Sequence, residues 1–349
     1  MSRYPCGPWR ATGGTAKRSS SSERTPPTLE LRFAPREGGS SMLSRIAESL
    51  FWIGRYVERA DGTSRILDVH LERLNHLPLE EQRSVARELL AVMGAKPQSE
   101  DFGLPELLHA LAYDKHSASS IAGSLGAARE NARRARETVS QSLWESLNTT
   151  YYGLNQHRKD VVGTYRFCNW VLERTAMVRG LADTTVSHDE SWLFMVLGRS
   201  LERADMTARM LSTRDVQSAG MSWVNMLRCA GAYESFIRTR RAAFGDQHAA
   251  EFLLLDRLFP RSIVYALRDA DECLAKLDPS AQRVGFINDA RRIVGQARTF
   301  LEFHRTDDLM SELPEHMERV QKAVTQASDA ISRKYFNQAD EHAWVGEVS

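Results

Sequence analysis

The chain has 349 residues and a mass of 39.4 kDa, enough for one large domain or two smaller ones. Its net charge of +1, with 42% hydrophobic and 26% charged residues, argues against a nucleic-acid-binding protein built on bulk positive charge. The four cysteines are far apart and form no Cys-x-x-Cys pair, and no apolar run approaches the roughly 20 residues that span a bilayer. We therefore expect a cytoplasmic protein without a disulfide framework, zinc ribbon or membrane span.

Residues 1–41 differ in composition from the rest of the chain. They hold 5 of the 11 prolines, 5 of the 21 glycines, and seven basic against three acidic side chains. Such a segment buries too little apolar surface to offset its ordering entropy, so we expect it to be disordered, with an organelle transit peptide as the alternative. We place the start of the natural protein at Met42 as a hypothesis, and we expect a flexible tail at 338–349.

From Met42 onward, apolar residues recur three and four positions apart, which is the period of an amphipathic helix. The six prolines of this part all suit helix edges, and no stretch alternates apolar and polar residues as a strand would. We predict an all-α fold, a multi-helix bundle of about ten helices. The expected helices cover 43–77, 79–93, 104–114, 117–152, 160–186, 188–214, 221–244, 248–258, 262–277, 280–304 and 314–336.

One stretch of the first long helix occurs twice. Residues 54–67 read GRYVERADGTSRIL and residues 198–211 read GRSLERADMTARML, so that nine of fourteen positions are identical at an offset of 144. A weaker echo, Asp-x5-Ser-Ile-x3-Leu, relates residues 114–125 to 256–267 at an offset of 142. The two nearly equal offsets predict two pseudo-symmetric helical units, 42–187 and 188–337.

The polar matches of this repeat require partners, because a helix core has no other use for them. On a helical wheel Glu58, Asp61 and Arg65 line one flank of the apolar seam, while Arg55 and Arg59 fall on the far side. The second copy repeats the pattern with Arg199, Glu202, Arg203, Asp205 and Arg209.

We favour a buried ion-pair network that fixes the register of the two units, with Glu58 meeting Arg209 and Glu202 meeting Arg65. The alternative is a pocket that holds a charged ligand, with Glu58 and Glu202 as candidate catalytic residues.

Other candidate sites are weaker. Arg129, Arg133 and Arg136 form a basic stripe, which we interpret as a solvated helix face rather than a site for an acidic partner or a phosphate. A di-iron bundle needs two Glu-x-x-His motifs and two further glutamates, and the chain has one such motif, at Glu106 and His109. The sequence therefore predicts no metal site, and we expect no cofactor, because phosphate-loop and dinucleotide motifs are also missing.

The residues 42–60, MLSRIAESLFWIGRYVERA, resemble the start of the bacterial alpha-E family, a domain of unknown function. The resemblance extends over nearly all of 42–337 and includes 128–133, 144–148, the second GRSLERAD and 259–262. It implies an all-helical protein, named for its glutamates, whose relatives accompany or are fused to a circularly permuted ATP-grasp ligase and a transglutaminase-like cysteine peptidase.

Two functions are compatible with this resemblance. The first is a non-catalytic helical accessory or scaffold that works with the ligase and the transglutaminase-like protein on amide bonds of peptides or proteins. The second is an enzyme of amide chemistry that uses Glu58 or Glu202 as general acid or base, with arginines binding a carboxylate. We expect no nucleic-acid or membrane partner, and a homo-oligomer is left open.

Overall fold

The computed structural model describes residues 44–95, 102–157, 159–212, 222–239, 245–279 and 285–336. These residues form fourteen α-helices, somewhat more than the ten expected, and no strand occurs among them. The prediction of an all-α bundle is confirmed. The expectations for residues 1–41, for Met42 and for 338–349 concern residues outside this description.

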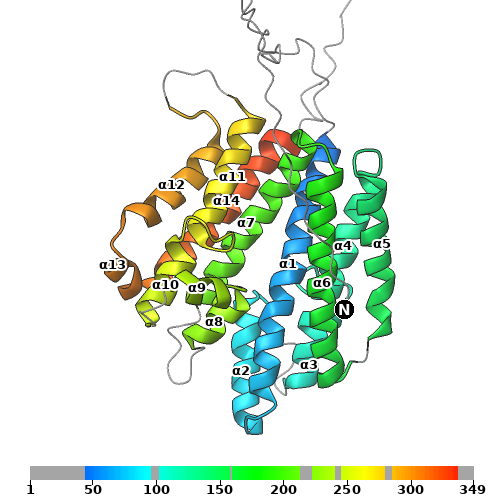
Figure 1. The fold of residues 1–349 in the computed structure, drawn as a ribbon, viewed down its shortest axis with the longest axis vertical. Coiled ribbons are helices and arrows are strands. Elements are labelled where there is room, and N and C mark those ends of the chain that lie inside the picture. Colours follow the sequence, from blue (N-terminus) through cyan, green and yellow to red (C-terminus); the bar gives the residue numbers. More distant parts are fainter. Residues whose placement is uncertain are drawn as a thin grey trace, which may run out of the picture. The chain divides into compact units, whose positions relative to one another are not determined.

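Two long helices occupy the centre of the bundle, as Figure 1 shows. α1 runs over Ser44–Leu74 and α7 over Glu190–Ser212, and they contact each other more extensively than any other pair of helices described. α1 carries the first copy of the repeated stretch and α7 carries the second. The repeat therefore forms the centre of the fold.

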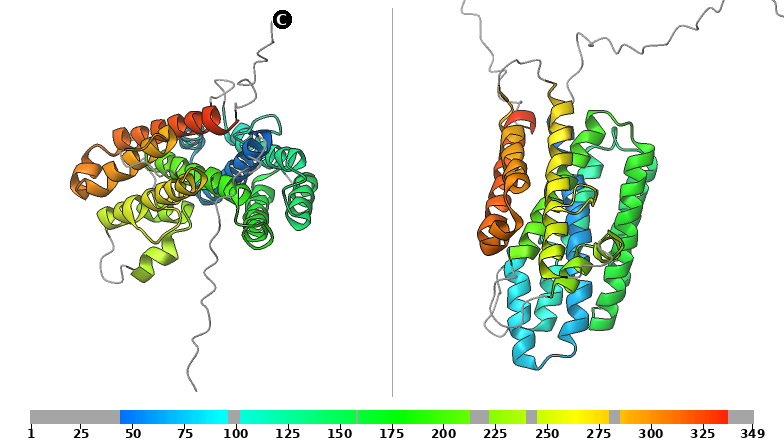
Figure 2. Two further views of the ribbon diagram at one scale, coloured as in Figure 1. Left: turned by 90° about the horizontal axis from the view of Figure 1, so that it is seen from above. Right: turned by 60° about the vertical axis from the view of Figure 1, so that its left-hand side comes forward.

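Three of the helices that follow each central helix in the chain lie on one side of it, two in direct contact with it and the third packed on those two. α4 and α6 pack on α1 and α5 lies outside them, while α11 and α14 pack on α7 and α12 lies outside them. The view from above in Figure 2 shows these two sets on opposite sides of the central pair. Their bounds are Ile121–Arg134 (α4), Gln141–Gly153 (α5), Val161–Thr185 (α6), Ile263–Leu277 (α11), Asp289–Phe303 (α12) and Leu313–Ile331 (α14).

Shorter helices connect these elements. The α-helices are α2 (Leu79–Val92), α3 (Leu104–Leu108), α8 (Trp223–Cys229), α9 (Tyr233–Thr239), α10 (Asp246–Leu255) and α13 (Thr306–Ser311). Single turns of other helix types are η1 (His109–Tyr113), η2 (Leu154–Gln156) and η4 (Ser332–Phe336).

The weaker sequence echo is a helix start. The carboxylates of Asp114 and Asp256 accept hydrogen bonds from backbone N–H groups two or three residues later in the chain. The hydroxyls of Ser120 and Ser262 donate to the backbone carbonyl oxygens of the same two aspartates. Each hydroxyl also caps the helix that follows, by accepting the backbone N–H three residues on. The pattern Asp-x5-Ser thus sets the loops that start α4 and α11.

Two expected helices are broken in the structure. The helix expected over 117–152 was wrong as one element: α4 ends before a turn in which the N–H groups of Thr138 and Val139 both bond to the carbonyl of Ala135, and Ser140 caps α5. The helix expected over 221–244 is α8 followed by α9. Gly231 stands between them with a φ of 61°, a conformation that favours glycine and ends a helix.

The backbones of α1 and α7 approach closely at the glycine that opens each copy of the repeat. A Cβ on Gly54 would overlap the carbonyl oxygen of Met195, and a Cβ on Gly198 would overlap that of Phe51. Phe51 and Met195 are themselves 144 residues apart, so the two contacts are reciprocal. Only glycine permits this crossing, which brings the residues on either side of it within reach of the other helix.

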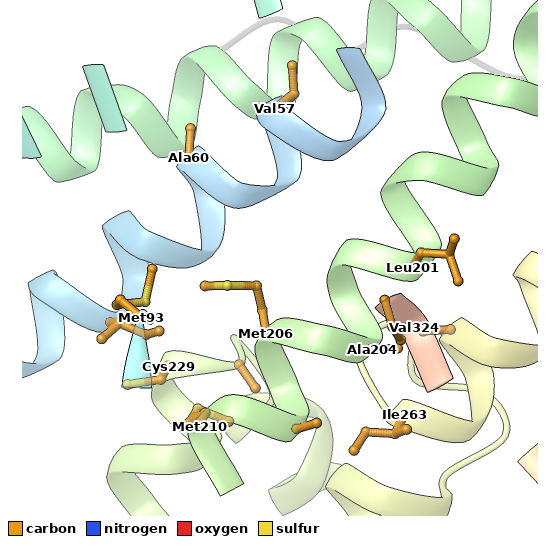
Figure 3. Packing of buried hydrophobic residues seen from close by; sticks show 14 of the residues in the cluster. Val57, Ala60, Met93, Leu201, Ala204, Met206, Met210, Cys229, Ile263 and Val324 are labelled. Atoms are coloured by element: carbon orange, nitrogen blue, oxygen red, sulfur yellow. The ribbon is translucent and has the colours of Figure 1, made fainter. Parts of the chain in front are cut away.

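The apolar core continues on both sides of this crossing. Figure 3 shows Val57 and Ala60 on α1, Leu201 and Ala204 on α7, and the Met206 side chain extending from α7 toward α1. Gly62 occupies the position equivalent to Met206, and the Met206 Cε lies 2.9 Å from where a Cβ on Gly62 would be. A large side chain in one copy therefore fills the space that a small residue leaves in the other.

Candidate functional site: an arginine–carboxylate network between the central helices

The two repeated glutamates lie between α1 and α7, just past the glycine crossing. Glu58 is 2% exposed and Glu202 is fully buried. Each glutamate pairs with the arginine next to the other: Arg59 Nε lies 2.5 Å from Glu202 Oε1, and Arg203 Nε lies 3.0 Å from Glu58 Oε1. The Glu-Arg pairs of the two copies thus join the helices by reciprocal contacts.

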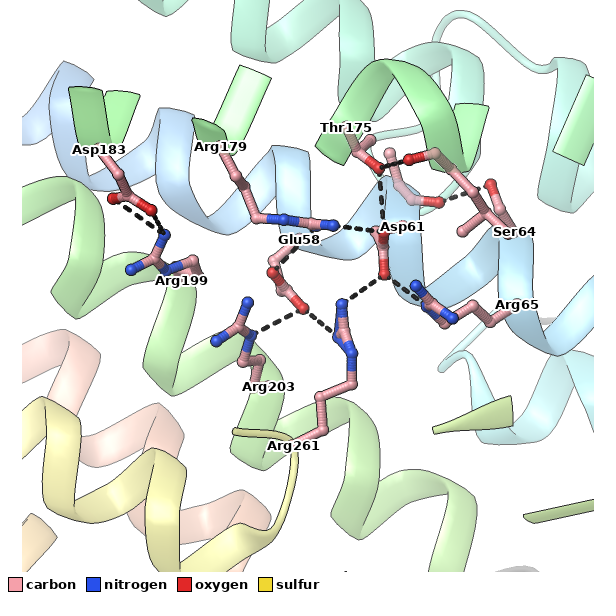
Figure 4. A network of polar contacts seen from close by, with 12 residues as sticks. Glu58, Asp61, Ser64, Arg65, Thr175, Arg179, Asp183, Arg199, Arg203 and Arg261 are labelled. Atoms are coloured by element: carbon pink, nitrogen blue, oxygen red, sulfur yellow. Dashed lines mark hydrogen bonds and ion pairs between the residues drawn. The ribbon is translucent and has the colours of Figure 1, made fainter. Parts of the chain in front are cut away.

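Glu58 and the fully buried Asp61 share two further arginines that come from outside the repeat. Arg261 contacts Glu58 Oε1 at 2.5 Å and Asp61 Oδ2 at 2.7 Å, while Arg179 contacts Asp61 Oδ1 at 3.0 Å and Glu58 Oε2 at 3.5 Å. Figure 4 shows both guanidinium groups placed between the two carboxylates. Arg65 completes the set, because its Nε lies 2.8 Å from Asp61 Oδ2.

The two carboxylates of the second copy, Glu202 and Asp205, contact fewer of the described arginines than those of the first. Glu202 accepts hydrogen bonds from Arg55 at 2.6 Å and from Arg59 at 2.5 Å and 3.0 Å. Asp205 pairs with Arg209 at 2.6 Å, one turn along its own helix. Arg55 also donates to the Ser328 hydroxyl at 2.8 Å, which links this part of the network to α14.

The expected pairs between Glu58 and Arg209 and between Glu202 and Arg65 were wrong, as was the placement of Arg55 and Arg59 away from the seam. Arg55 is buried against α7. Arg65 lies eleven residues beyond Gly54, about 16 Å along the helix axis, so it reaches only the carboxylate of its own helix. The glycine crossing, rather than the apolar seam, decides which charged residues reach the partner.

Arg179, Arg261 and Thr175, whose hydroxyl donates to Asp61 at 2.9 Å, were missed as members of the network. Arg261 lies inside the second echo, where the first copy has Ser119, so an arginine without a counterpart was a usable signal. Arg179 and Thr175 lie on α6 without any repeated neighbour. Nothing in the sequence pattern marks them.

Burial and pairing act in opposite directions on these carboxyl groups. Burial alone would raise the pKa of Glu58, but Arg203 and Arg261 lower it to about 2 from an ordinary 4.5. The pKa of Asp61 is also lowered, since Arg261 and Arg179 outweigh its burial, and Arg55 and Arg59 do the same for the pKa of Glu202. At Asp205 burial dominates, followed by the charge of Glu202, and its pKa is raised.

The remaining predicted residues form no ion pair with the carboxylates of this network. Arg199 pairs with Asp183 at 3.4 Å. Arg133 and Arg134 pair with Glu130 on the surface of α4, as a solvated face would, at 2.7 Å and 3.5 Å. Arg129 belongs to no such face, because it donates to Asn148 at 2.8 Å and lies against a set of aromatic rings. Those rings are Trp144, Tyr151 and Tyr152, and Arg136 lies over the first of them.

The described ranges contain no group of three His, Cys, Asp or Glu side chains arranged to hold a metal ion. In the single Glu-x-x-His motif, the Glu106 carboxylate instead accepts the backbone N–H of Gly103 at 3.0 Å and caps α3. None of the described helices is both long and apolar enough to cross a membrane.

The fold and the network define a class of protein: an all-helical bundle in which two long central helices cross at glycines and are joined by buried Glu-Arg pairs. The chain belongs to the alpha-E family, described as a predicted alpha-helical domain with a conserved ER motif, whose model matches residues 42–336.

The curated relatives are longer than this chain, and their names state no activity. Uncharacterized proteins of Mycobacterium bovis and of two strains of Mycobacterium tuberculosis are each 24% identical to the chain over 326 residues. The match covers 82% of this chain and 36% of each relative, so the chain spans about a third of their length. No solved structure matches.

Proposed function

We propose that this alpha-E domain is a cytoplasmic helical scaffold without catalytic activity of its own, which works with an ATP-grasp ligase and a transglutaminase-like protein in forming or trimming amide bonds. The observation that carries the proposal is that both repeated glutamates are buried and bound by arginines. A general acid or base must exchange protons with substrate, and its pKa should lie near the working pH. Glu58, with a pKa of about 2, is suited to holding helices together.

The partners in this proposal come from the resemblance to the alpha-E family. The length of the curated relatives supports a domain that acts joined to others, because the matched region makes up 36% of each.

Affinity purification from the native host, with the tag at the C-terminus, tests the proposal. We expect an ATP-grasp ligase or a transglutaminase-like protein to co-purify in stoichiometric amount, as identified by mass spectrometry and size-exclusion chromatography. An unrelated helical protein with the same tag serves as the control for capture by the tag.

The enzyme alternative predicts a different result. Purified protein would then turn over a peptide substrate unaided, and Glu58→Gln would abolish turnover while the helical circular-dichroism signal and melting temperature stay unchanged. A protein that purifies without partners and behaves in this way contradicts the scaffold proposal.

A further inference from the structure

Positive charge is in surplus on one side of the network. Two carboxylates, Glu58 and Asp61, are contacted by four guanidinium groups, those of Arg65, Arg179, Arg203 and Arg261. The side chains of these arginines are at most 25% exposed, so bulk water screens their charge only in part. Charges buried to this degree are normally paired. Asp68 lies near Arg65 and offsets its charge, which leaves three guanidinium groups around Glu58 and Asp61, and this surplus favours a further anion.

Two arginines of α7 have hydrogen-bond donors to offer this anion. The Arg203 side chain is 12% exposed and its Nε lies 3.0 Å from Glu58 Oε1, while its two terminal nitrogens make no hydrogen bond to any described residue. Arg199, one turn earlier, makes only two long contacts of 3.4 Å to Asp183, and its buried Nε has no partner in the described part of the chain. Figure 4 shows both guanidinium groups on the same side of Glu58, with Arg179 across from them.

An apolar pocket adjoins Arg179 and Arg199, while Arg203, one turn further along α7, lines a second pocket that shares Glu58 with the first. The first pocket is partly open, has a volume of about 30 Å³ and is lined by side chains of α1, α5, α6 and α7, among them Val57, Val178 and Trp192, with Arg179 and Arg199 beside them. A water molecule needs roughly 10–15 Å³ of such space, so the pocket has room for a small apolar group. Two carboxylates face the same space. Glu58 is paired with three arginines, and Asp183 accepts hydrogen bonds from Trp192 and Arg199.

We propose that Arg179, Arg199 and Arg203 bind the oxyanion of a small ligand, a carboxylate or a phosphate, beside this pocket. The planar fork of a guanidinium group matches both kinds of oxyanion through paired hydrogen bonds. The apolar lining favours a carboxylate attached to a small apolar group, such as the C-terminal end of a peptide. This site is independent of the scaffold's partners, since it requires only residues of this chain.

Binding to the purified full-length chain tests the site. The probes are inorganic phosphate, a short N-acetylated peptide that ends in alanine with a free carboxylate, and the same peptide as the C-terminal amide, each at constant ionic strength set with sodium chloride. A ligand present at ten times its Kd should raise Tm by about 2 °C in differential scanning fluorimetry. Isothermal titration calorimetry gives Kd.

Arg203→Met is the test variant, and Arg133→Met, at a surface arginine, is its matched control. Arg203→Met is expected to fold, because Glu58 keeps Arg261 and Arg179 as partners, and circular dichroism checks this. Arg199→Met provides a second variant with all contacts of Glu58 intact.

We expect at least one of the two oxyanion probes to bind the natural chain and the Arg133→Met variant, and to bind Arg203→Met and Arg199→Met at least ten times more weakly. Binding by the acid peptide and not by its amide identifies a carboxylate ligand, and binding by phosphate alone identifies a phosphate. The site is overturned if neither probe binds the natural chain, or if both arginine variants bind as tightly as the control does. A failure here leaves the co-purification result unaffected.

Discussion

Asp61 and Asp205 stand at the same position of the two repeats, yet their surroundings differ. Asp61 is fully buried and is bound by Arg65, Arg179 and Arg261 together with a threonine hydroxyl. Asp205 is nearly as buried, but within the described residues its ion pair is with Arg209 alone. The pKa is therefore lowered at Asp61, where three guanidinium groups outweigh burial, and raised at Asp205, where burial dominates.

This difference shows which contacts a repeated sequence determines. The Glu58–Arg203 and Glu202–Arg59 pairs and the two glycine contacts are reciprocal, because both partners are repeated. The Arg55–Glu202 pair has no such counterpart, because Arg199, the equivalent of Arg55, pairs with Asp183. Contacts to the covering helices differ, because Arg261 in the second copy of the weaker echo corresponds to Ser119 in the first. α1 has consequently become the more heavily paired of the two central helices, and substitutions at equivalent positions should have equal effects near the crossing and unequal effects away from it.

The largest effect should come from the glycine crossing. Gly54→Ala and Gly198→Ala each place a Cβ against a backbone carbonyl of the other helix, which no side-chain movement can relieve. We expect each to lower the free energy of unfolding by about 4 kcal/mol, or to prevent folding, since overpacking a core costs about 1–3 kcal/mol even where side chains can move. Urea denaturation followed by circular dichroism measures the loss.

Gly180→Ala and Gly295→Ala are matched controls within helices α6 and α12. Apart from the backbone of the same helix, no described atom lies within 4 Å of a Cβ at either position, so alanine should stabilise each helix by about 0.5–1 kcal/mol. Equal losses at the two central glycines would support the reciprocal crossing, and a loss at only one of them would contradict it.

Glu58→Gln should have the next largest effect. It leaves Arg179, Arg203 and Arg261 without their shared carboxylate, and removing one partner of a buried ion pair costs about 3–5 kcal/mol. Glu202→Gln should cost somewhat less, because it leaves two arginines unpaired rather than three. Glu130→Gln, in a surface pair, should cost less than about 1 kcal/mol.

The lowered pKa of Glu58 predicts that the free energy of unfolding depends on pH. The pKa of Glu58 is about 2 in the folded chain and ordinarily 4.5, so its ionised form stabilises the fold above pH 4.5, and this contribution disappears as the pH falls from 4.5 toward 2. The shift corresponds to about 3 kcal/mol. Unfolding free energies measured between pH 7 and pH 2.5 should therefore fall more steeply for the natural chain than for Glu58→Gln. Parallel curves would show that Glu58 is not held in this way.

A pair of asparagine substitutions tests the difference between the two aspartates directly. Asp61→Asn should lower the free energy of unfolding at pH 7 by about 3 kcal/mol, because it removes a buried partner of three arginines. Asp205→Asn should leave stability at pH 7 unchanged or raise it, since the ionised carboxylate is itself disfavoured there. Any such gain should shrink as the pH falls and Asp205 takes up its proton. Equal losses in the two variants would show that the surroundings of the aspartates are energetically equivalent.

The sequence predicted the helical fold because apolar periodicity and prolines at helix edges report local structure directly. It predicted that Glu58 and Glu202 belong to one charged network because both lie in the repeat. It did not predict the breaks before Ser140 and at Gly231, where a capping serine and a left-handed glycine interrupt otherwise helical patterns.

The partners within the network were mispredicted for a geometric reason. A helical wheel gives the direction of each side chain but not the point at which two helices cross, and the crossing determines that Arg59 rather than Arg65 reaches Glu202. The contributions of Arg179 and Thr175 depend on how α6 packs against α1, which is a tertiary contact without a sequence signature.

The smallest effect should distinguish two arginines that the sequence placed in one stripe. Arg129 donates to Asn148 and its guanidinium carbon lies 4.8 Å from the centre of the Tyr151 ring, whereas the Arg133 side chain is 60% exposed. Arg129→Met should cost about 1 kcal/mol through the lost cation–π and hydrogen-bond contacts, and Arg133→Met no more than about 0.5 kcal/mol. Urea denaturation of both variants measures the difference, and equal costs would show that Arg129 is solvated in the same way as Arg133.

A larger cost for Arg129 would show that α4 and α5 are held together by an arginine among aromatic rings. The corresponding helices α11 and α12 are joined instead by Asp271 between Arg291 and Arg298.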